Sequence, residues 1–260
     1  MIDEIWNHIA SGTANALEIT TLVVAILICI IGIVALIVSI YLSIKYVKFN
    51  KQKNSAQLTG EEVARKLLDK NGLNHIKIKV SGSLLFGNSY SHYFKKIRLR
   101  RFTTKKKSLT SLAMGAQKAS LAVLDKENNA EMKRRIRLYP LIVFGPYAFV
   151  PLILIGLLIE MLVINTNGLI AIGFCVLALV FYILSIVLSV ATLKTEKLAQ
   201  EKAYEILKKE NLATDEEIAQ MKELFRLYNI QYINNIILST LELIYYILQI
   251  ILNYSSSSSK

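Results

Sequence analysis

The chain has 260 residues, of which 53% are apolar, with a formal net charge of +12 and a mean hydropathy of +0.43. This composition is typical of a membrane protein, but the charge shows that a sizeable polar part lies outside the lipid. The only two cysteines, Cys29 and Cys175, lie in apolar runs, which excludes a disulfide framework and predicts that both are buried.

The first apolar run lies close to the start of the chain. Residues 1–18 contain three acids and no Lys or Arg, and residues 19–44 are uncharged and mostly apolar. A cleaved signal peptide has a basic front and a shorter apolar core, so we expect a retained first transmembrane helix. Lysines follow it directly and mark the cytoplasmic side, which places the N-terminus outside. They are Lys45, Lys48, Lys51 and Lys53.

The next part, up to residue 138, predicts a mixed α and β domain. Thr59 and Glu62 have the capping-box spacing of a helix start, and Asn71-Gly72 is a helix stop. Two later stretches alternate apolar and basic residues, as strands do. The expected elements are a helix at Gly60–Lys70, strands at His75–Val80 and Ile97–Arg100, a loop between them at Ser81–Phe94, and a small-residue helix at Ser108–Leu124.

This domain is strongly basic, with 23 Lys and Arg against 6 Asp and Glu between Lys45 and Arg137. A cytoplasmic position explains the excess, because positive residues are favoured there and the anionic leaflet attracts them. Nucleic-acid binding is the weaker alternative, because no recognition motif accompanies the basic residues. The candidate basic surface consists of Arg98, Arg100, Arg101, Lys105, Lys106 and Lys107.

The longest apolar stretch runs from Leu138 to Leu193 and carries one charge, Glu160. It is too long for one crossing of about 20 residues and predicts two helices that fold back on each other at residues 165–168. All three prolines lie in the first of them, so we expect it to be bent or broken near Gly145–Pro151.

Residues 194–229 have mixed charge and helical periodicity, with a second capping box at Thr214–Glu217. A last apolar run leads into a serine-rich tail. The predicted order is an extracytoplasmic N-terminus (1–18), a transmembrane helix (19–44), the basic cytoplasmic domain (45–138), two transmembrane helices (139–163 and 168–193), a cytoplasmic helical segment (194–229), a fourth transmembrane helix (230–254) and a disordered tail (255–260).

Glu242 lies in the middle of the fourth predicted crossing, where an acid costs roughly 2.5–3.5 kcal/mol to insert. One alternative is a protonated Glu242 that is hydrogen-bonded to a Ser, Thr or Asn of a neighbouring helix. The other is an ion or proton path, which is weakened because no second charge lies at that depth.

Two motifs carry a resemblance to a known family. The stretch Leu58–Arg65, followed by Asp69 and Asn71-Gly72-Leu73, is similar to the family's opening helix, and Pro140, Gly145, Pro151 and Leu152–Gly156 match its second membrane helix in spacing. From Leu58 to the C-terminus the chain resembles the bacterial membrane-embedded neutral zinc metallopeptidases. The resemblance implies a His-Glu-x-x-His site, in which two histidines one helical turn apart bind zinc and the glutamate is the general base.

Counting without gaps from the strand at Ile97–Leu99, and back from Pro140, places that motif at residues 117–121, which read Gln-Lys-Ala-Ser-Leu. Gln117 is a poor zinc ligand, Leu121 has no lone pair, and Lys118 puts a cation where the base belongs. By the resemblance, neither catalytic nor metal-binding residues remain at these positions.

Nor do other residues rebuild the site. The histidines are His8, His75 and His92, which lack helical ligand spacing. Residues Asn88–Ser91 stand where the family has a segment with a sequence like Asp-His-Tyr-Asp. Glu196 alone matches a later acidic residue that can serve as a third ligand in the family. We expect Lys118 and Glu196 to form an ion pair that closes the old site.

These inferences predict a polytopic α-helical membrane protein with four transmembrane helices and a small cytoplasmic α+β domain, zincin-like but degenerate by the resemblance. We interpret it as a pseudopeptidase of a bacterial cell membrane, with both termini extracytoplasmic and no cofactor. The expected partners are the bilayer with its anionic head groups and another membrane protein or an extended peptide bound near Gln117, Lys118 and Glu196. The alternatives are an active membrane zinc metallopeptidase with non-standard zinc ligands, and a small transporter or channel component that uses Glu242.

Overall fold

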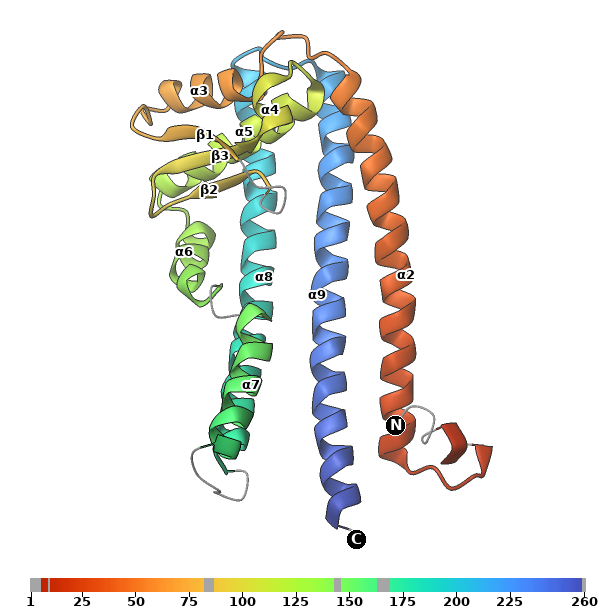
Figure 1. Ribbon diagram of the computed structural model, residues 1–260. Coiled ribbons are helices and arrows are strands. Elements are labelled where there is room, and N and C mark those ends of the chain that lie inside the picture. Colours follow the sequence, from red (N-terminus) through yellow and green to blue (C-terminus); the bar gives the residue numbers. More distant parts are fainter. Residues whose placement is uncertain (1–5, 9, 82–86, 143–145, 163–168, 259–260) are drawn as a thin grey trace. The chain divides into compact units, whose positions relative to one another are not determined.

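The computed structural model describes residues 6–8, 10–81, 87–142, 146–162 and 169–258 (Figure 1). The chain forms two compact units. The apolar unit contains Met1–Ile37, Leu141–Ser189 and Gln231–Lys260, and the mixed unit contains Val38–Pro140 and Val190–Ile230. The basic domain predicted at 45–138 is therefore only part of its unit, because side chains from the second segment complete the same core, among them Ala203, Leu207 and Phe225.

Among the described residues, three helices are long and apolar enough to cross a membrane: α2 (Ala16–Lys51), α8 (Leu169–Lys209) and α9 (Asp215–Ser258). In place of the crossing predicted at 139–163, helix α6 (Ala130–Ile142) ends and helix α7 (Pro146–Leu162) begins, which is apolar but has only 17 residues. Proline suits the first position of α7, because no backbone N–H is needed there. The predicted bend falls partly on residues 143–145, and the predicted turn on 165–168; these lie outside the described residues.

Helices α8 and α9 run through boundaries that the sequence analysis had placed at 193 and 229. Charged residues with high helix propensity extend each apolar helix without interruption into the mixed unit. Asn211, with φ at +52°, stands between the two helices, and the predicted capping box is confirmed because Thr214 and Glu217 exchange hydrogen bonds. The prediction of a disordered tail at 255–260 is wrong for residues 255–258, because helix α9 extends to Ser258.

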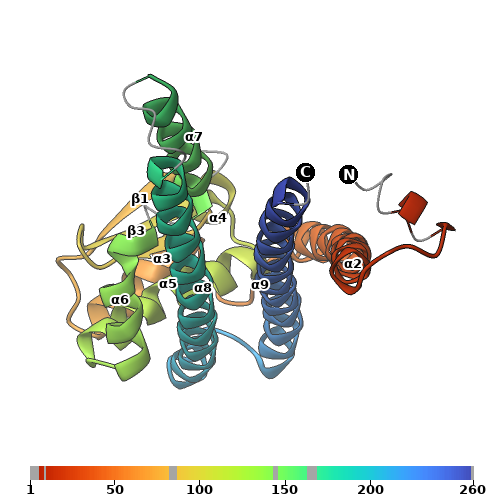
Figure 2. The same ribbon diagram turned by 90° about the horizontal axis from the view of Figure 1, so that it is seen from below.

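The apolar unit has only a small internal core. Helices α7 and α8 meet at Gly156, where a Cβ atom would lie 2.4 Å from the Cβ of Phe174 (Figure 2). In the three long helices only 6%, 11% and 6% of the apolar windows are buried, as in lipid-facing helices. Many of their apolar side chains are exposed. Cys29, which the sequence analysis expected to be buried, is one of these exposed residues.

The mixed unit combines a three-stranded sheet with short helices. Strand β1 (Lys77–Ser81) pairs in parallel with β3 (Lys96–Arg100), and β2 (Ser89–Ser91) pairs antiparallel with the other edge of β3. Both predicted strands are confirmed, but β2 lies in the stretch predicted to be a loop. Strand β2 has three residues and one apolar side chain, so it is too short to show the alternating pattern of a strand.

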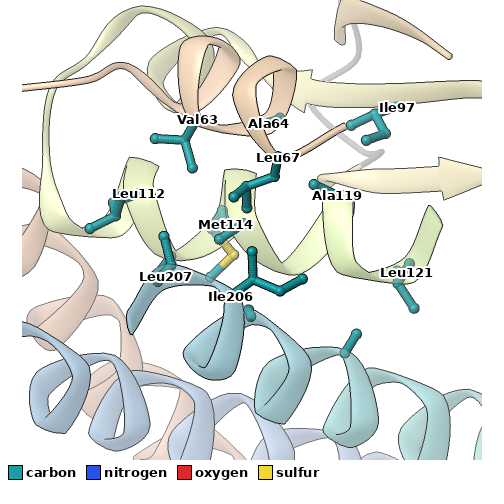
Figure 3. Packing of buried hydrophobic residues seen from close by; sticks show 14 of the residues in the cluster. Val63, Ala64, Leu67, Ile97, Leu112, Met114, Ala119, Leu121, Ile206 and Leu207 are labelled. Atoms are coloured by element: carbon teal, nitrogen blue, oxygen red, sulfur yellow. The ribbon is translucent and has the colours of Figure 1, made fainter. Parts of the chain in front are cut away.

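Between residue 60 and α6, whose residues up to Pro140 also belong to this unit, the described chain forms the helices α3 (Gly60–Lys70), α4 (Arg101–Lys105) and α5 (Leu109–Lys126). The capping box of α3 is confirmed, because Thr59 and Glu62 exchange hydrogen bonds. Helix α5 lies between α3 and α8 (Figure 3), and its small residues permit this close packing. A Cβ atom on Gly115 would lie 2.3 Å from the carbonyl oxygen of Gly60, so α3 and α5 are in contact at these two glycines.

We expect Gly115→Ala to lower the free energy of unfolding by about 1–3 kcal/mol, because the added methyl group would overlap the Gly60 carbonyl and force α3 and α5 apart. Unfolding of the full chain in detergent measures the effect. Gly173→Ala in α8 is the control, because a Cβ there meets nothing within 4 Å, and it should be neutral or stabilising by up to about 1 kcal/mol. Equal stabilities of the two variants would contradict the helix contact.

Candidate functional site

Helix α5 carries the residues that the sequence analysis aligned with the zinc motif. Ser108 caps the helix by accepting a hydrogen bond from the backbone N–H of Ser111, and every residue from Leu109 to Leu124 is buried. Gln117, Lys118 and Leu121 therefore all lie inside the mixed unit. A lysine in such a position requires an anionic partner, because an unpaired ammonium is costly to remove from water.

Glu196 of α8 is that partner. Its Oε2 atom lies 2.7 Å from Nζ of Lys118 and accepts a 2.9 Å hydrogen bond from Nε2 of Gln117. Its Oε1 atom lies 3.0 Å from Nη1 of Arg135, which also donates to the hydroxyl of Thr195 at 3.0 Å. The predicted ion pair of Lys118 and Glu196 is confirmed and extends into a cluster of three side chains around one carboxylate, which we call the Glu196 cluster (Gln117, Lys118, Arg135 and Glu196).

The electrostatics of this cluster keep Glu196 ionised. Burial alone would raise the pKa of its carboxyl group, but the Lys118 ammonium and the Arg135 guanidinium, by charge and by hydrogen bonding, hold the pKa below its usual value. The buried Lys118 and the partly buried Arg135 face the partly buried Glu196, so the cluster has a net charge of +1. The arrangement joins α5, α6 and α8.

Arg135 is a member of this site that the sequence analysis missed. It belongs to the basic run Lys133–Arg137, which precedes an apolar helix and resembles an ordinary membrane-boundary signal. Its position in the run does not indicate that it pairs with Glu196. A helical projection would have shown only that Arg135 and Met132, which is buried, lie on one face of α6.

A second polar cluster lies beside β2. Asp125 Oδ2 accepts a 2.5 Å hydrogen bond from the Tyr90 hydroxyl and lies 2.7 Å from Nδ1 of His92. Burial, together with the Asp125 carboxylate, raises the pKa of Tyr90 above its ordinary value, so this phenol stays protonated and donates. A cavity of about 20 Å³, room for one water molecule, lies between this cluster and Arg135.

The segment Asn88–Ser91 also has a structural role. Its last three residues form β2, and the Asn88 side chain accepts a hydrogen bond from the backbone N–H of Arg100 at 2.7 Å. This stretch therefore builds the sheet edge. The six residues of the candidate basic surface are all exposed on β3, α4 and the two residues after α4, and they take no part in the Glu196 cluster.

Glu242 lies in the apolar unit, far along the chain from this site. Its Oε2 atom accepts a 3.1 Å hydrogen bond from the hydroxyl of Tyr182 on α8. The hydrogen-bond alternative from the sequence analysis thus has a named partner, a tyrosine instead of the expected Ser, Thr or Asn.

A family model described as "Putative neutral zinc metallopeptidase" matches residues 24–251. The chain belongs to this family. The match spans both units and includes the whole of α3, the sheet, α5 and α8. A search of curated proteins and a search of solved structures each found no match.

The zinc that the family implies does not fit the residues at the motif positions. Zinc is bound by Cys, His, Asp or Glu, and of these the Glu196 cluster contains only Glu196, whose two oxygens are both engaged by cations. Leu121, at the position of the second histidine, is fully buried in the apolar core. Within the described ranges, no three His, Cys, Asp or Glu side chains are grouped so that they can hold a metal ion.

We expect Glu196→Gln to destabilise the chain by about 3–5 kcal/mol, because it leaves the buried Lys118 and the partly buried Arg135 without a counter-ion. Glu205→Gln, on the exposed face of the same helix, is the control and should change stability by less than about 0.5 kcal/mol. Because the folded-state pKa of Glu196 is lowered, its contribution is present above the unfolded-state pKa and is lost as the pH falls through the folded-state pKa. The stability difference from wild type should therefore shrink in acid; a constant difference would contradict this electrostatic role.

We expect Glu242→Gln to leave stability within about 0.5 kcal/mol of wild type, because the amide oxygen can still accept the Tyr182 hydrogen bond. Glu242→Leu should cost about 1–3 kcal/mol, since it leaves the Tyr182 hydroxyl without this acceptor. Ion flux through vesicles that contain the purified chain is the companion measurement. A flux that Glu242→Gln abolishes would establish the transport alternative instead.

Proposed function

We propose that this chain is a pseudopeptidase: a membrane-bound member of the neutral zinc metallopeptidase family that keeps the family's fold without its hydrolytic site. The observation that carries the proposal is the Glu196 cluster, in which Lys118 and Arg135 bind the one carboxylate that matches a metal ligand of the family. In this view the mixed unit is a degenerate zincin-like domain, with α5 as the former motif helix.

The residues of the cluster also lack the means to activate water. A general base must be free to accept a proton, but Lys118 donates a hydrogen bond to Glu196, and Glu196 is held by two cations at a lowered pKa. Gln117 donates its amide N–H to the same carboxylate. Each group satisfies another member of the cluster, so the arrangement stabilises the unit.

Binding without cleavage is the function that remains for this fold. Because Gln117, Lys118 and Glu196 are enclosed, a partner cannot reach them and must meet the neighbouring surface of β2 and α6. Tyr93 and Tyr139 are exposed there, with ring centroids 5.9 Å apart. We propose that this surface holds an extended peptide or another membrane protein.

The connectivity supports four crossings and the orientation inferred from the sequence. We propose that the segments that enter and leave the mixed unit lie on one side of the membrane. A chain that leaves this unit through α6 and re-enters it along a membrane-spanning α8 must cross the bilayer at α7. Seventeen helical residues span about 26 Å, close to the hydrocarbon thickness of about 30 Å. The lysines after residue 44 then place the mixed unit in the cytoplasm and both termini outside.

The decisive experiment is the zinc content of the detergent-purified full chain, measured by mass spectrometry of the metal beside Glu196→Ala. We expect wild type and variant alike to contain far less than one zinc per chain, and neither to show proteolysis that a chelator abolishes. Near-stoichiometric zinc in wild type that is lost in Glu196→Ala, together with chelator-sensitive proteolysis, would instead establish an active peptidase with non-standard ligands.

A gain-of-metal variant tests the alignment itself. Gln117→His, Lys118→Glu and Leu121→His together restore two imidazoles one helical turn apart beside Glu196, and this triple variant should bind zinc. The same triple variant with Glu196→Ala is its matched control and should bind zinc much more weakly. Equal zinc contents of these two variants would show that Glu196 does not face the motif positions.

A further inference from the structure

The sheet of the mixed unit has one apolar face and one cationic face. Side chains of paired residues point to the same side of a sheet, and successive residues of a strand point to opposite sides. The register pairs Lys77 with Lys96, Lys79 with Arg98, and Ser81 with Arg100, and places Ser89 and Ser91 of β2 opposite Arg98 and Lys96. The alternate residues, such as Ile97 and Leu99, are buried in the core. We call the five cations and three serines of the outer side the basic sheet face.

No carboxylate belongs to this face. Four of its five cations are exposed, and Lys96 is half-buried. Within the part of the chain that the structure describes, none of the five has an ion-pair partner. Partial burial and the neighbouring charges of Arg98 and Lys79 lower the pKa of Lys96, which is consistent with unrelieved repulsion across the face. The groove that Lys77 and Lys79 line also contains Glu61, Glu62 and Asp69 of α3, but these acids belong to the helix and not to the sheet.

An exposed phenylalanine stands at each end of β3. Phe94 precedes the strand and is 68% exposed, with Nζ of Lys96 4.3 Å from its ring centroid. Phe102 follows the strand and is 62% exposed, with Nζ of Lys106 5.3 Å from its ring centroid. Apolar rings beside cations match a membrane interface, where rings enter the acyl boundary while ammonium groups remain among phosphates.

We propose that the basic sheet face, with Phe94 and Phe102, is a docking surface for a bilayer that contains anionic lipids. The cations of this face attract anionic lipids, and the sheet belongs to the same chain as the helices that can cross a membrane. Helices α2, α8 and α9 each have the length and composition to cross a membrane and each continue into the mixed unit, so a lipid surface is always within reach. The inference is independent of the fate of the metal site.

The spacing of the two rings favours lipid over single-stranded nucleic acid. Phe94 and Phe102 are separated by the whole of β3, which at about 3.3 Å per residue places them on the order of 20 Å apart. Two rings so far apart cannot stack on adjacent bases, which is the arrangement that nucleic-acid platforms use. They can act as two separate anchors in an interface.

The test uses the full chain in lipid nanodiscs, so that lipid is available on both sides. The single tryptophan of the chain is Trp6, which makes Trp6→Phe with Phe94→Trp a one-reporter background. We compare fluorescence quenching by brominated acyl chains in phosphatidylcholine discs with and without phosphatidylglycerol. We expect quenching at least about twofold stronger with the anionic lipid, and loss of that difference in high salt.

Lys96→Glu with Arg98→Glu in the same background should abolish the difference, and neither side chain has a hydrogen bond whose loss would unfold the sheet. The matched control is Lys197→Glu with Lys209→Glu, which removes the same charge from exposed positions of α8 and should leave the difference intact. Arg98→Gln is a milder second variant and should reduce it partly. Equal quenching in neutral and anionic discs, or a difference that survives charge reversal, would overturn the proposal. The proposal would also be overturned if the fluorescence of the reporter did not change with lipid but did change when a single-stranded oligonucleotide was added. That result would assign the face to nucleic acid.

Discussion

The mixed unit depends on one carboxylate. Glu196 is the anion that allows Lys118 to lie in an otherwise buried helix and Arg135 to pack beside it. The three groups come from α5, α6 and α8, and the last of these belongs to a segment more than fifty residues further along the chain. An ammonium in that interior without its counter-ion would be expensive, so the pairing couples the packing of α5 to the docking of α8.

If the chain is the pseudopeptidase that we propose, the same carboxylate explains how the unit stays stable without a metal site. A zinc site joins neighbouring segments through bonds to several ligands, and loss of those ligands removes the link. Here the Lys118 and Arg135 side chains supply positive charge on either side of Glu196, so the segments stay joined through hydrogen-bonded ion pairs. Such pairs give cohesion but neither a Lewis acid nor a free base.

The sheet separates two tasks on its two faces. The inner face contributes Ile97, Leu99 and Tyr90 to the core against α5, whereas the outer face is entirely Lys, Arg and Ser. Alternation along two strands concentrates the charge, because parallel register brings the basic positions of β1 and β3 side by side. The composition shows a basic excess for the domain as a whole, and the sheet concentrates basic residues on one surface.

The sequence by itself determined what depends on neighbours along the chain. The apolar runs, the capping boxes of α3 and α9 and the helix stop at Asn71 were all predictable, because each is a local pattern. The alignment of Gln117, Lys118 and Leu121 with the family motif rests on the resemblance and stays a prediction. Only the tertiary structure decided the strand β2, the parallel pairing of β1 with β3, the completion of the core by residues 190–230, and the role of Arg135. These depend on contacts between segments distant in sequence, and in a single sequence Arg135 does not differ from the other basic residues of its run.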